Sequence, residues 1–487
     1  MEVRLVLISH TNVGKTSLAR TLLRRDVGEI VDAAHTTLEN QRHVLVEQND
    51  DRLVLWDTPG FGNSARLRDR LQQRERPLGW FLGQVWDRFT DRSLWCAQQA
   101  MRAVRDEGDL VLYLVNASED PEFATYIDSE LEILEWLEVP VLVLLNQLPP
   151  QGRPEARTAL EASWRRALDR PSVKAVLALD AFERCWIDES RLLLTAAETL
   201  GRENATERAE ALGRLLPIWQ QGQLERFRAS IDAIARALAR VTTDREPLGR
   251  GQSNRIGRAA ALKRLARRLE TTVAELESTL VRLEELEGAS AQRVEAALTA
   301  TRDHGDRPSP GSGAAGGALA GAGAGALLDL LFAGLTFGVF TTLGASLSAA
   351  AGFSWCWQAV DRRTLGWSAA FIEDLTVELA ARYLAVTHHG RARGRFDGSA
   401  LDSWREPGGE MAVGAETTSL KRLTNLIEDT EAGSETAMPV AAPLVRDVLV
   451  RALLTDYPTA RWILGDTAAE MPGGLSQPAG LCPLRSG

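Results

Sequence analysis

The sequence is poor in lysine and cysteine and shows no secretory leader. Only four of its 56 basic residues are lysine, so a lysine that falls within a motif is informative. The four cysteines lie far apart with no CxxC pair, which argues against a disulfide framework or a zinc site and fits a reducing cytoplasm. The opening residues MEVRLVLISH carry charges but no small-residue cleavage site, so they predict a strand rather than a signal peptide.

An excess of positive charge is lacking as well. The chain has 66 acidic against 56 basic residues, a net charge of -10, which argues against a protein that coats a polyanion and leaves room for a local basic patch. Hydrophobic residues at 45% and charged residues at 25% exclude a wholly disordered, collagen-like or multi-span membrane protein. A length of 487 residues predicts about two to four domains.

The first 200 residues alternate short aliphatic runs with helical patterns. Continuous apolar runs separated by helices indicate a mostly parallel sheet that is covered on both faces. We therefore expect an α/β domain over residues 1–200. The predicted strands are Val3–Ile8, Val44–Glu47, Leu53–Trp56, Leu110–Asn116, Val139–Leu145 and Val173–Leu179.

Helical patterns replace strands in residues 201–305. Apolar residues at spacings of three and four over 224–241 form one stripe of a helix. Leucines recur at every seventh residue over 262–283. Leu265 and Leu286 follow two of them by three residues, but threonine fills the other two matching positions, so bundle packing within the chain and a dimeric coiled coil both stay open. Residues 361–487 are also expected to be mainly helical, with helices over 374–384 and 443–454 and a loose tail.

Residues 306–360 are rich in glycine and alanine. Between Arg307 and Asp361 the one charged residue is Asp329, and small residues recur every fourth position. Such spacing lets helices approach closely in lipid, and the length allows one span of about 20 residues or a two-helix hairpin. A buried helical pair in a soluble domain explains the same composition. Whether residues 313–352 enter the inner membrane of an otherwise cytoplasmic protein is open.

A phosphate-binding loop is predicted by SHTNVGKT at residues 9–16, directly after the first strand and before a helical pattern over 17–24. Main-chain N–H groups at a helix N-terminus face an anion, and a lysine adds full charge. Lys15 is expected to grip the β- and γ-phosphates and Thr16 to bind Mg²⁺. Ser9 replaces the usual first glycine, and because serine is less free at positive φ, we expect a slightly altered turn. The other nucleotide-binding candidates in the loop are Asn12, Val13, Gly14 and Ser17.

A second phosphate-sensing motif, DTPG at residues 57–60, follows the predicted strand over 53–56. Asp57 is placed to hold Mg²⁺, and the Gly60 amide to contact a γ-phosphate. Between the two motifs, Thr36 and Thr37 lie where a switch threonine would close on the metal and the γ-phosphate. Thr37 is the favoured candidate.

Through TNVGKTSL, the threonine pair and DTPG, the first 200 residues resemble the TrmE–Era class of small bacterial GTPases. The resemblance implies a P-loop GTPase that binds GTP and GDP, with Lys15, Thr37 and Gly60 catalytic and Thr16, Thr37 and Asp57 holding Mg²⁺. It also implies a long, uncharacterised helical region after the GTPase domain, for which it offers no mechanism.

Two positions depart from a familiar pattern. The class reads guanine with NKxD, but this chain has Asn146 followed by Gln-Leu-Pro, and Pro149 has no acceptor side chain. Asp180, after the sixth predicted strand, can substitute as the base reader or cap the next helix, and ATP stays open as a ligand. Phe61 stands where Ras-type enzymes place a water-orienting glutamine, a feature shared with the class. The resemblance implies K⁺ bound by Asn12 as the replacement, with GTP-dependent dimerisation.

Two further sequence features are candidates for interaction surfaces. Aromatic residues crowd 80–95, either packing an insertion onto the sheet or forming an effector surface. A basic run (residues 236–268) holds ten Arg or Lys against two acids, which fits solvated helix faces or an anionic lipid or RNA partner. No KH-like GxxG loop is present, so ribosome binding is unsupported. A GTP hydrolysis switch and a nucleotide-gated membrane scaffold with slow hydrolysis are the two functional hypotheses.

Overall fold

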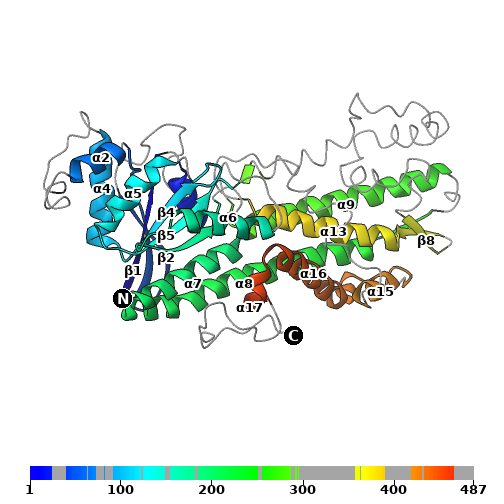
Figure 1. Cartoon of the computed structure of the whole chain (residues 1–487). Coiled ribbons are helices and arrows are strands. Elements are labelled where there is room, and N and C mark those ends of the chain that lie inside the picture. The colour runs from blue at the N-terminus through cyan, green and yellow to red at the C-terminus, as the bar shows by residue number, and fades with distance from the viewer. Residues whose placement is uncertain are drawn as a thin grey trace, which may run out of the picture. The chain divides into compact units, whose positions relative to one another are not determined.

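The chain divides into two compact units in the computed structural model (Figure 1). The first contains Met1–Glu225, Thr387–Gly394 and Leu454–Gly487, and the second Arg226–Val386 and Arg395–Leu453. The domain boundaries at 200, 305 and 360 expected from composition stay predictions. The structure describes residues 1–11, 13–24, 40–62, 64–72, 82, 92–121, 124–148, 154–180, 185–249, 255–286, 291–292, 294, 357–361, 363–389, 418–429 and 433–464.

A six-stranded sheet in the order β2-β3-β1-β4-β5-β6 forms the centre of the first unit. Only β2 pairs antiparallel, with β3, and the four other pairings are parallel. This confirms the predicted α/β class. The strands are β1 (Glu2–Ser9), β2 (Gln41–Gln48), β3 (Asp51–Asp57), β4 (Leu110–Asn116), β5 (Val141–Asn146) and β6 (Val173–Ala178).

Helices cover both faces of this sheet (Figure 1). They are α1 (Lys15–Leu23), α2 (Ser64–Gln72), α4 (Arg92–Glu107), α5 (Thr125–Glu135), α6 (Pro154–Ala167) and α7 (Trp186–Arg202). Apolar side chains of α2, α4, α5 and α6 share one core with alternate residues of β1, β4 and β5. The intervening strand residues, such as Leu5 and Leu7, are buried too, and α1 and α7 contact β1 and β6. Strands that are apolar on both faces need two such helical layers.

The second unit is mainly helical, as predicted. Its elements are α8 (Thr206–Thr242), which begins in the first unit, α9 (Arg255–Leu283), α13 (Ala369–Thr387), α15 (Thr418–Asn425), α16 (Ser434–Asp456), and a small sheet of β7 (Arg245–Pro247), β9 (Thr364–Trp367) and β8 (Trp357–Asp361). The apolar stripe predicted for α8 is confirmed, because all six of its residues are buried. They are Leu224, Phe227, Ile231, Ile234, Leu238 and Val241.

The leucine helix, α9, packs against other helices of this chain. Leu269 and Leu276 are buried, and Glu277 of α9 binds Arg382 of α13 in an ion pair that is itself buried. A buried ion pair between two helices fixes their packing, since neither charge can be left without the other. Of the two interpretations of the leucine repeat, the structure therefore favours bundle packing.

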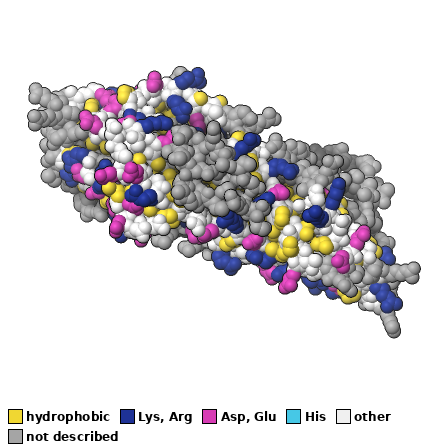
Figure 2. Space-filling model, turned by 90° about the horizontal axis from the view of Figure 1, so that it is seen from below, with side chains coloured by type: hydrophobic (Ala, Val, Ile, Leu, Met, Phe, Trp, Pro, Cys, Tyr) yellow, Lys and Arg dark blue, Asp and Glu magenta, His cyan; other side chains and the backbone are white. Residues whose placement is uncertain are grey.

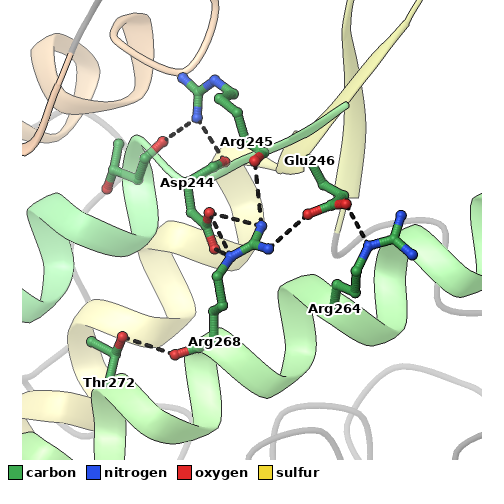
Figure 3. A network of polar contacts seen from close by, with 7 residues as sticks. Asp244, Arg245, Glu246, Arg264, Arg268 and Thr272 are labelled. Atoms are coloured by element: carbon green, nitrogen blue, oxygen red, sulfur yellow. Dashed lines mark hydrogen bonds and ion pairs between the residues drawn. The ribbon is translucent and has the colours of Figure 1, made fainter. Parts of the chain in front are cut away.

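A charged network joins β7 to α9 (Figure 3). Arg268 donates from Nη1 to Glu246 at 2.7 Å and from Nε to Asp244 at 3.0 Å, and Arg264 donates to Glu246 at 2.5 Å. Arg245 donates to two main-chain carbonyls just after α15, at 2.6 and 2.9 Å. The network uses both acidic residues of the basic run, and Arg240 pairs with Glu275, so at least four of the ten cations of the run have partners within the protein.

On the face drawn in Figure 2, Lys and Arg side chains are interspersed with Asp and Glu over the described surface. Among the described helices, none is long and apolar enough to cross a bilayer. Most of the glycine- and alanine-rich segment predicted as a membrane hairpin, residues 306–356, lies outside the described residues, so membrane contact stays a prediction.

Candidate functional site

The predicted phosphate-binding loop lies between β1 and α1. Strand β1 ends at Ser9, Gly14 adopts a φ of 101°, and α1 begins at Lys15. Glycine is needed at 14, because the left-handed φ disfavours side chains and a Cβ there would lie 2.7 Å from Asn146 Nδ2. The loop thus brings Lys15 and the first N–H groups of a helix to one point at the edge of the sheet.

Ser9 needs no positive φ in this turn. It is the last residue of β1 and is not among the described residues with positive φ, so a side chain is tolerated there. Its hydroxyl instead accepts a hydrogen bond from Lys15 Nζ at 2.8 Å. Both side chains are buried. Ser9 therefore holds the lysine at the position from which it would meet a phosphate.

Thr16 and Asp57 form the predicted metal pair. The parallel register of β1 and β3 aligns Leu7 with Asp57, and Thr16 Oγ1 donates to Asp57 Oδ2 at 3.0 Å. Asp57 is 1% exposed, and its Oδ1 has no hydrogen-bond partner within the described part of the chain. A hydroxyl beside a buried carboxylate with a spare oxygen suits Mg²⁺, a hard cation that takes oxygen ligands. These two residues fit the metal that the motifs imply.

Burial disfavours the charged forms of both Lys15 and Asp57. Burial lowers the pKa of Lys15 to about 8, although the nearby carboxylates of Asp57 and Glu130 act in the opposite direction. Burial raises the pKa of Asp57 to about 6, against the opposing effects of Lys15 and Thr16. A bound anion and cation would each supply the opposite charge that one of these groups lacks.

Gly60 lies against the phosphate-binding loop. A Cβ at this position would lie 2.9 Å from Lys15 Nζ and 3.2 Å from the main chain of Thr11, so a larger residue would displace the lysine. The next residue, Phe61, lies opposite His10 in a parallel bridge, because its N–H donates to the Ser9 carbonyl at 2.9 Å and its carbonyl accepts the Thr11 N–H at 3.1 Å. Its side chain is fully buried in the core. Phe61 therefore points away from any attacking water, consistent with its being unable to orient one.

Asn146 connects the end of β5 to the phosphate-binding loop. At the end of β5 it is fully buried and donates from Nδ2 to the carbonyl of Val13 at 2.6 Å. Asp180, just after β6, accepts the main-chain N–H of Leu148 at 2.8 Å. Asp180 does not cap the next helix, whose N-cap is Cys185. It lies beside the residues after Asn146, and its role as base reader stays a prediction.

Several predicted positions lie outside the described residues. Among the site residues these are Asn12, Thr36, Thr37 and Pro149, and among the aromatic residues of the insertion Trp80, Phe81, Trp86 and Phe89. The structure thus brings together Ser9, Val13, Gly14, Lys15, Thr16, Asp57, Gly60 and Asn146, with Asp180 beside the residues that follow Asn146.

One polar cluster at the loop was not predicted. His10 Nδ1 lies 2.7 Å from an oxygen of Glu130, a fully buried residue of α5, whose other oxygen accepts the hydroxyl of Tyr113 at 2.7 Å. The signal in the sequence was a glutamate on the face of α5 that also carries Ile127 and Leu134, since an acid there needs partners. The cluster fixes the second residue of the loop to the core.

The strand, loop, helix and metal pair define a P-loop GTPase domain. Residues 4–147 match the family model described as 50S ribosome-binding GTPase. Residues 165–455, more than half of the chain, match the model described as Domain of unknown function (DUF3482). The chain belongs to this DUF3482 family, with the GTPase domain at its N-terminus.

Solved structures of GTP-binding proteins resemble part of the chain. A variant of Era from Aquifex aeolicus bound to GDP and AlF4⁻ is 18% identical, covering 37% of this chain and 51% of that one, at a TM-score of 0.29. Era in complex with MgGDPNP and a 16S ribosomal RNA fragment is 18% identical, covering 37% of this chain and 51% of that one, at a TM-score of 0.28. A probable GTP-binding protein engB is 14% identical, covering 37% of this chain and 88% of that one, at a TM-score of 0.24. The matched region spans about half of the Era chains. Among curated proteins none matches.

Replacing Ser9 with glycine should leave the phosphate-binding loop intact. The change removes one hydrogen bond from the Lys15 ammonium to an uncharged hydroxyl, worth about 1.5 kcal/mol, which no longer competes with a phosphate for the lysine. We expect GDP to bind as tightly as to the wild type or up to about 10-fold more tightly, measured with a fluorescent GDP analogue. A tenfold loss of affinity in Ser9→Gly would show that the hydroxyl helps to bind nucleotide rather than to hold the lysine.

Proposed function

We propose that the protein is a molecular switch that binds GTP with Mg²⁺ and hydrolyses it to GDP and phosphate. One observation carries the proposal: the Lys15 ammonium lies 2.8 Å from Ser9 at the end of β1, while Thr16, one residue on, bonds to the buried Asp57 at the end of β3. A lysine, a hydroxyl and a carboxylate at one edge of a parallel sheet are the groups that a magnesium nucleoside triphosphate requires.

Each of these groups has a separate task. Lys15 would contact the β- and γ-phosphate oxygens, on which negative charge shifts as the bond between them breaks. Thr16 and Asp57 would hold Mg²⁺, which neutralises phosphate charge when bound. Gly60, whose missing side chain leaves room for Lys15, would report the presence of the γ-phosphate through its amide, and Thr37 would close over it.

Guanine is the base that we propose for this site, by membership of the GTPase family. Asn146 donates to the phosphate-binding loop, but Pro149 provides no carboxylate for the base. Asp180 is the substitute that we propose, because its carboxylate accepts the main-chain N–H of Leu148, two residues after Asn146. A nucleotide site with this departure can lose its preference for guanine, so ATP is the competitor to test.

Phe61 cannot hydrogen-bond an attacking water, so hydrolysis needs another device. We propose that K⁺ bound with the help of Asn12 supplies positive charge to the transition state, as the resemblance to TrmE implies, and that the hydrolysis rate is low without K⁺ or GTP-dependent dimerisation. Replacing Na⁺ by K⁺ should raise the single-turnover rate of GTP hydrolysis by about 10-fold or more, a fraction of what an arginine finger provides. Asn12→Ala should abolish the difference. Equal wild-type rates in the two salts would contradict the role of K⁺ and leave GTP binding intact.

A nucleotide-gated scaffold at the membrane is the alternative function, and it depends on the composition of residues 306–360 alone. The same single-turnover assay with and without anionic lipid vesicles separates the two functions. A catalytic rate that is independent of lipid supports the hydrolysis switch, whereas GTP-dependent capture on vesicles with slow hydrolysis supports the scaffold. The name of the matching GTPase family does not assign a ribosomal partner to this chain.

A further inference from the structure

Five side chains form a buried cluster around the hydroxyl of Tyr457. Tyr457 precedes a short 3-10 helix (Pro458–Ala460), and its hydroxyl lies 3.1 Å from Nε2 of His388, just after α13. The guanidinium of Arg157 and the thiol of Cys185 lie beside the same hydroxyl and interact with it. Arg157 in turn binds Asp188 at 2.8 Å and lies 5.4 Å from the centre of the Tyr457 ring. We call these five residues the Tyr457 cluster.

The Tyr457 cluster joins distant parts of the chain within the first unit. Arg157 lies in the first turn of α6, and Cys185 and Asp188 lie at the start of α7, all belonging to the GTPase fold. His388 and Tyr457 come from the two C-terminal segments that belong to the same unit. His388 and Tyr457, from these two segments, thus hold the first turns of two helices of the nucleotide-binding fold.

These two helices follow the strands that lead to the purine base. In open α/β sheets the ligand lies beyond the carboxyl ends of the strands. β1 and β3 carry the phosphate groups Lys15 and Asp57, so the base would lie beyond β5 and β6. α6 follows β5, whose Asn146 binds the phosphate-binding loop, and α7 follows β6, whose neighbour Asp180 binds Leu148. The Tyr457 cluster thus fixes the first turns of α6 and α7, the helices that follow β5 and β6.

Resting on the GTP binding proposed above, we propose that Tyr457 is a positioning residue for recognition of the purine base. Its ring and hydroxyl connect α6 and, through the Arg157–Asp188 ion pair, α7 to the C-terminal segments, and the positions of α6 and α7 set how tightly guanine is held. The C-terminal part of the chain thereby adjusts the affinity and selectivity of the nucleotide site without contacting the nucleotide.

The chemistry of the hydroxyl supports this role. A tyrosine hydroxyl has one proton to donate and can accept two hydrogen bonds. The Arg157 guanidinium can only donate to it, so the single proton is left for His388 or Cys185. Burial raises the pKa of Tyr457 far above its usual value, which keeps that proton in place. Phenylalanine would preserve the ring against Arg157 and remove the bond to His388 and the polar contacts of the hydroxyl with Arg157 and Cys185.

Tyr457→Phe in the full chain is the test, with binding of GDP and ADP measured by displacement of a fluorescent GDP analogue. We expect the affinity for GDP to fall by about 10-fold, the effect of losing hydrogen bonds that include a charged group, and the preference for GDP over ADP to narrow. Amide exchange in peptides covering 154–160 and 185–192 should quicken. Tyr383→Phe, which removes the hydroxyl of a fully buried tyrosine of α13 in the second unit, should change neither quantity.

Arg157→Gln is a second variant, which keeps the inference testable if Tyr457→Phe lowers the yield of folded protein. It removes the ion pair with Asp188 and should also lower the affinity for GDP and narrow the preference for GDP over ADP. A merely structural cluster would lower the melting temperature and leave the ratio of GDP to ADP affinity unchanged, which would overturn the inference. Failure of the wild type to bind GDP would remove the proposed function as well. Wild-type binding with an unchanged ratio in both variants removes this inference alone.

Discussion

Lys15→Ala should lower the affinity for GTP by about 100-fold or more. Hydrogen bonds to charged groups contribute about 1.5–3 kcal/mol each, and every 1.4 kcal/mol changes a dissociation constant tenfold. Lys15 Nζ lies 2.8 Å from Ser9 and 2.9 Å from where a Cβ of residue 60 would lie, so it is held between the two phosphate-sensing motifs. Displacement of a fluorescent GTP analogue measures the loss.

The same substitution should not destabilise the fold. Burial lowers the pKa of Lys15 to about 8, which means that the folded protein holds this charge unfavourably when no phosphate is bound. The melting temperature of Lys15→Ala without nucleotide should therefore equal or exceed that of the wild type. Lys174 of β6 offers a matched control, because it pairs with Glu203 at the surface, and Lys174→Ala should leave affinity unchanged. Unaltered GTP affinity in Lys15→Ala would contradict the site.

Arg382→Leu should produce the largest loss of stability. The guanidinium is 1% exposed on its side-chain surface and binds Glu277 of α9 and Glu378 of its own helix, the latter at 2.8 Å. Removing one member of a buried ion network takes its charge away from the other members, at a cost of about 3–5 kcal/mol. Here two buried glutamates would lose the arginine that they share. Urea denaturation of the helical unit, followed by circular dichroism, measures the change.

The reason for this loss can be tested with a second variant. Converting both glutamates to glutamine together with Arg382→Leu should recover most of the stability, because no buried charge is then left without a partner. Arg267→Leu on the exposed face of α9 is the control and should change stability by less than about 0.5 kcal/mol. A small effect of Arg382→Leu itself would show that the three side chains are not a network on which the helices depend.

The parts of the fold that follow from local sequence were predicted well. The buried strands β1, β3, β4, β5 and β6 read as continuous apolar runs, and the Thr16–Asp57 pair follows from two motifs at the ends of parallel strands. β2 was predicted over residues 44–47 but extends over Gln41–Gln48. It is an edge strand with an exposed face, so its polar ends carry no apolar signal.

The contacts that sequence reasoning missed join residues far apart in the chain. His10 and Glu130 are separated by 120 residues, and His388 and Tyr457 by 69. Periodicity and spacing report which face of an element is buried, but not which polar group meets another across the core. Asp180 illustrates the limit: its place after β6 was evident, yet its bond to the Leu148 amide depends on how two loops meet.

Ser9 shows the opposite error, in which a family rule was applied too strictly. A glycine is usual at this position, and its replacement suggested a slightly altered turn. In the structure β1 ends at Ser9 without a positive φ, and the described loop residue with a positive φ is Gly14, the second glycine of the motif. Ser9 therefore needs no unusual conformation, and its hydroxyl gains a partner in Lys15.

Calorimetric titration of the full chain with GTP and with ATP, in the presence of Mg²⁺, tests the central claim most directly. The account predicts heat and saturation with GTP, weaker binding of ATP, and a loss of both signals in Lys15→Ala. Absence of heat with either nucleotide would contradict the assignment of this pocket to phosphate binding, and equal affinities for the two would contradict the choice of guanine.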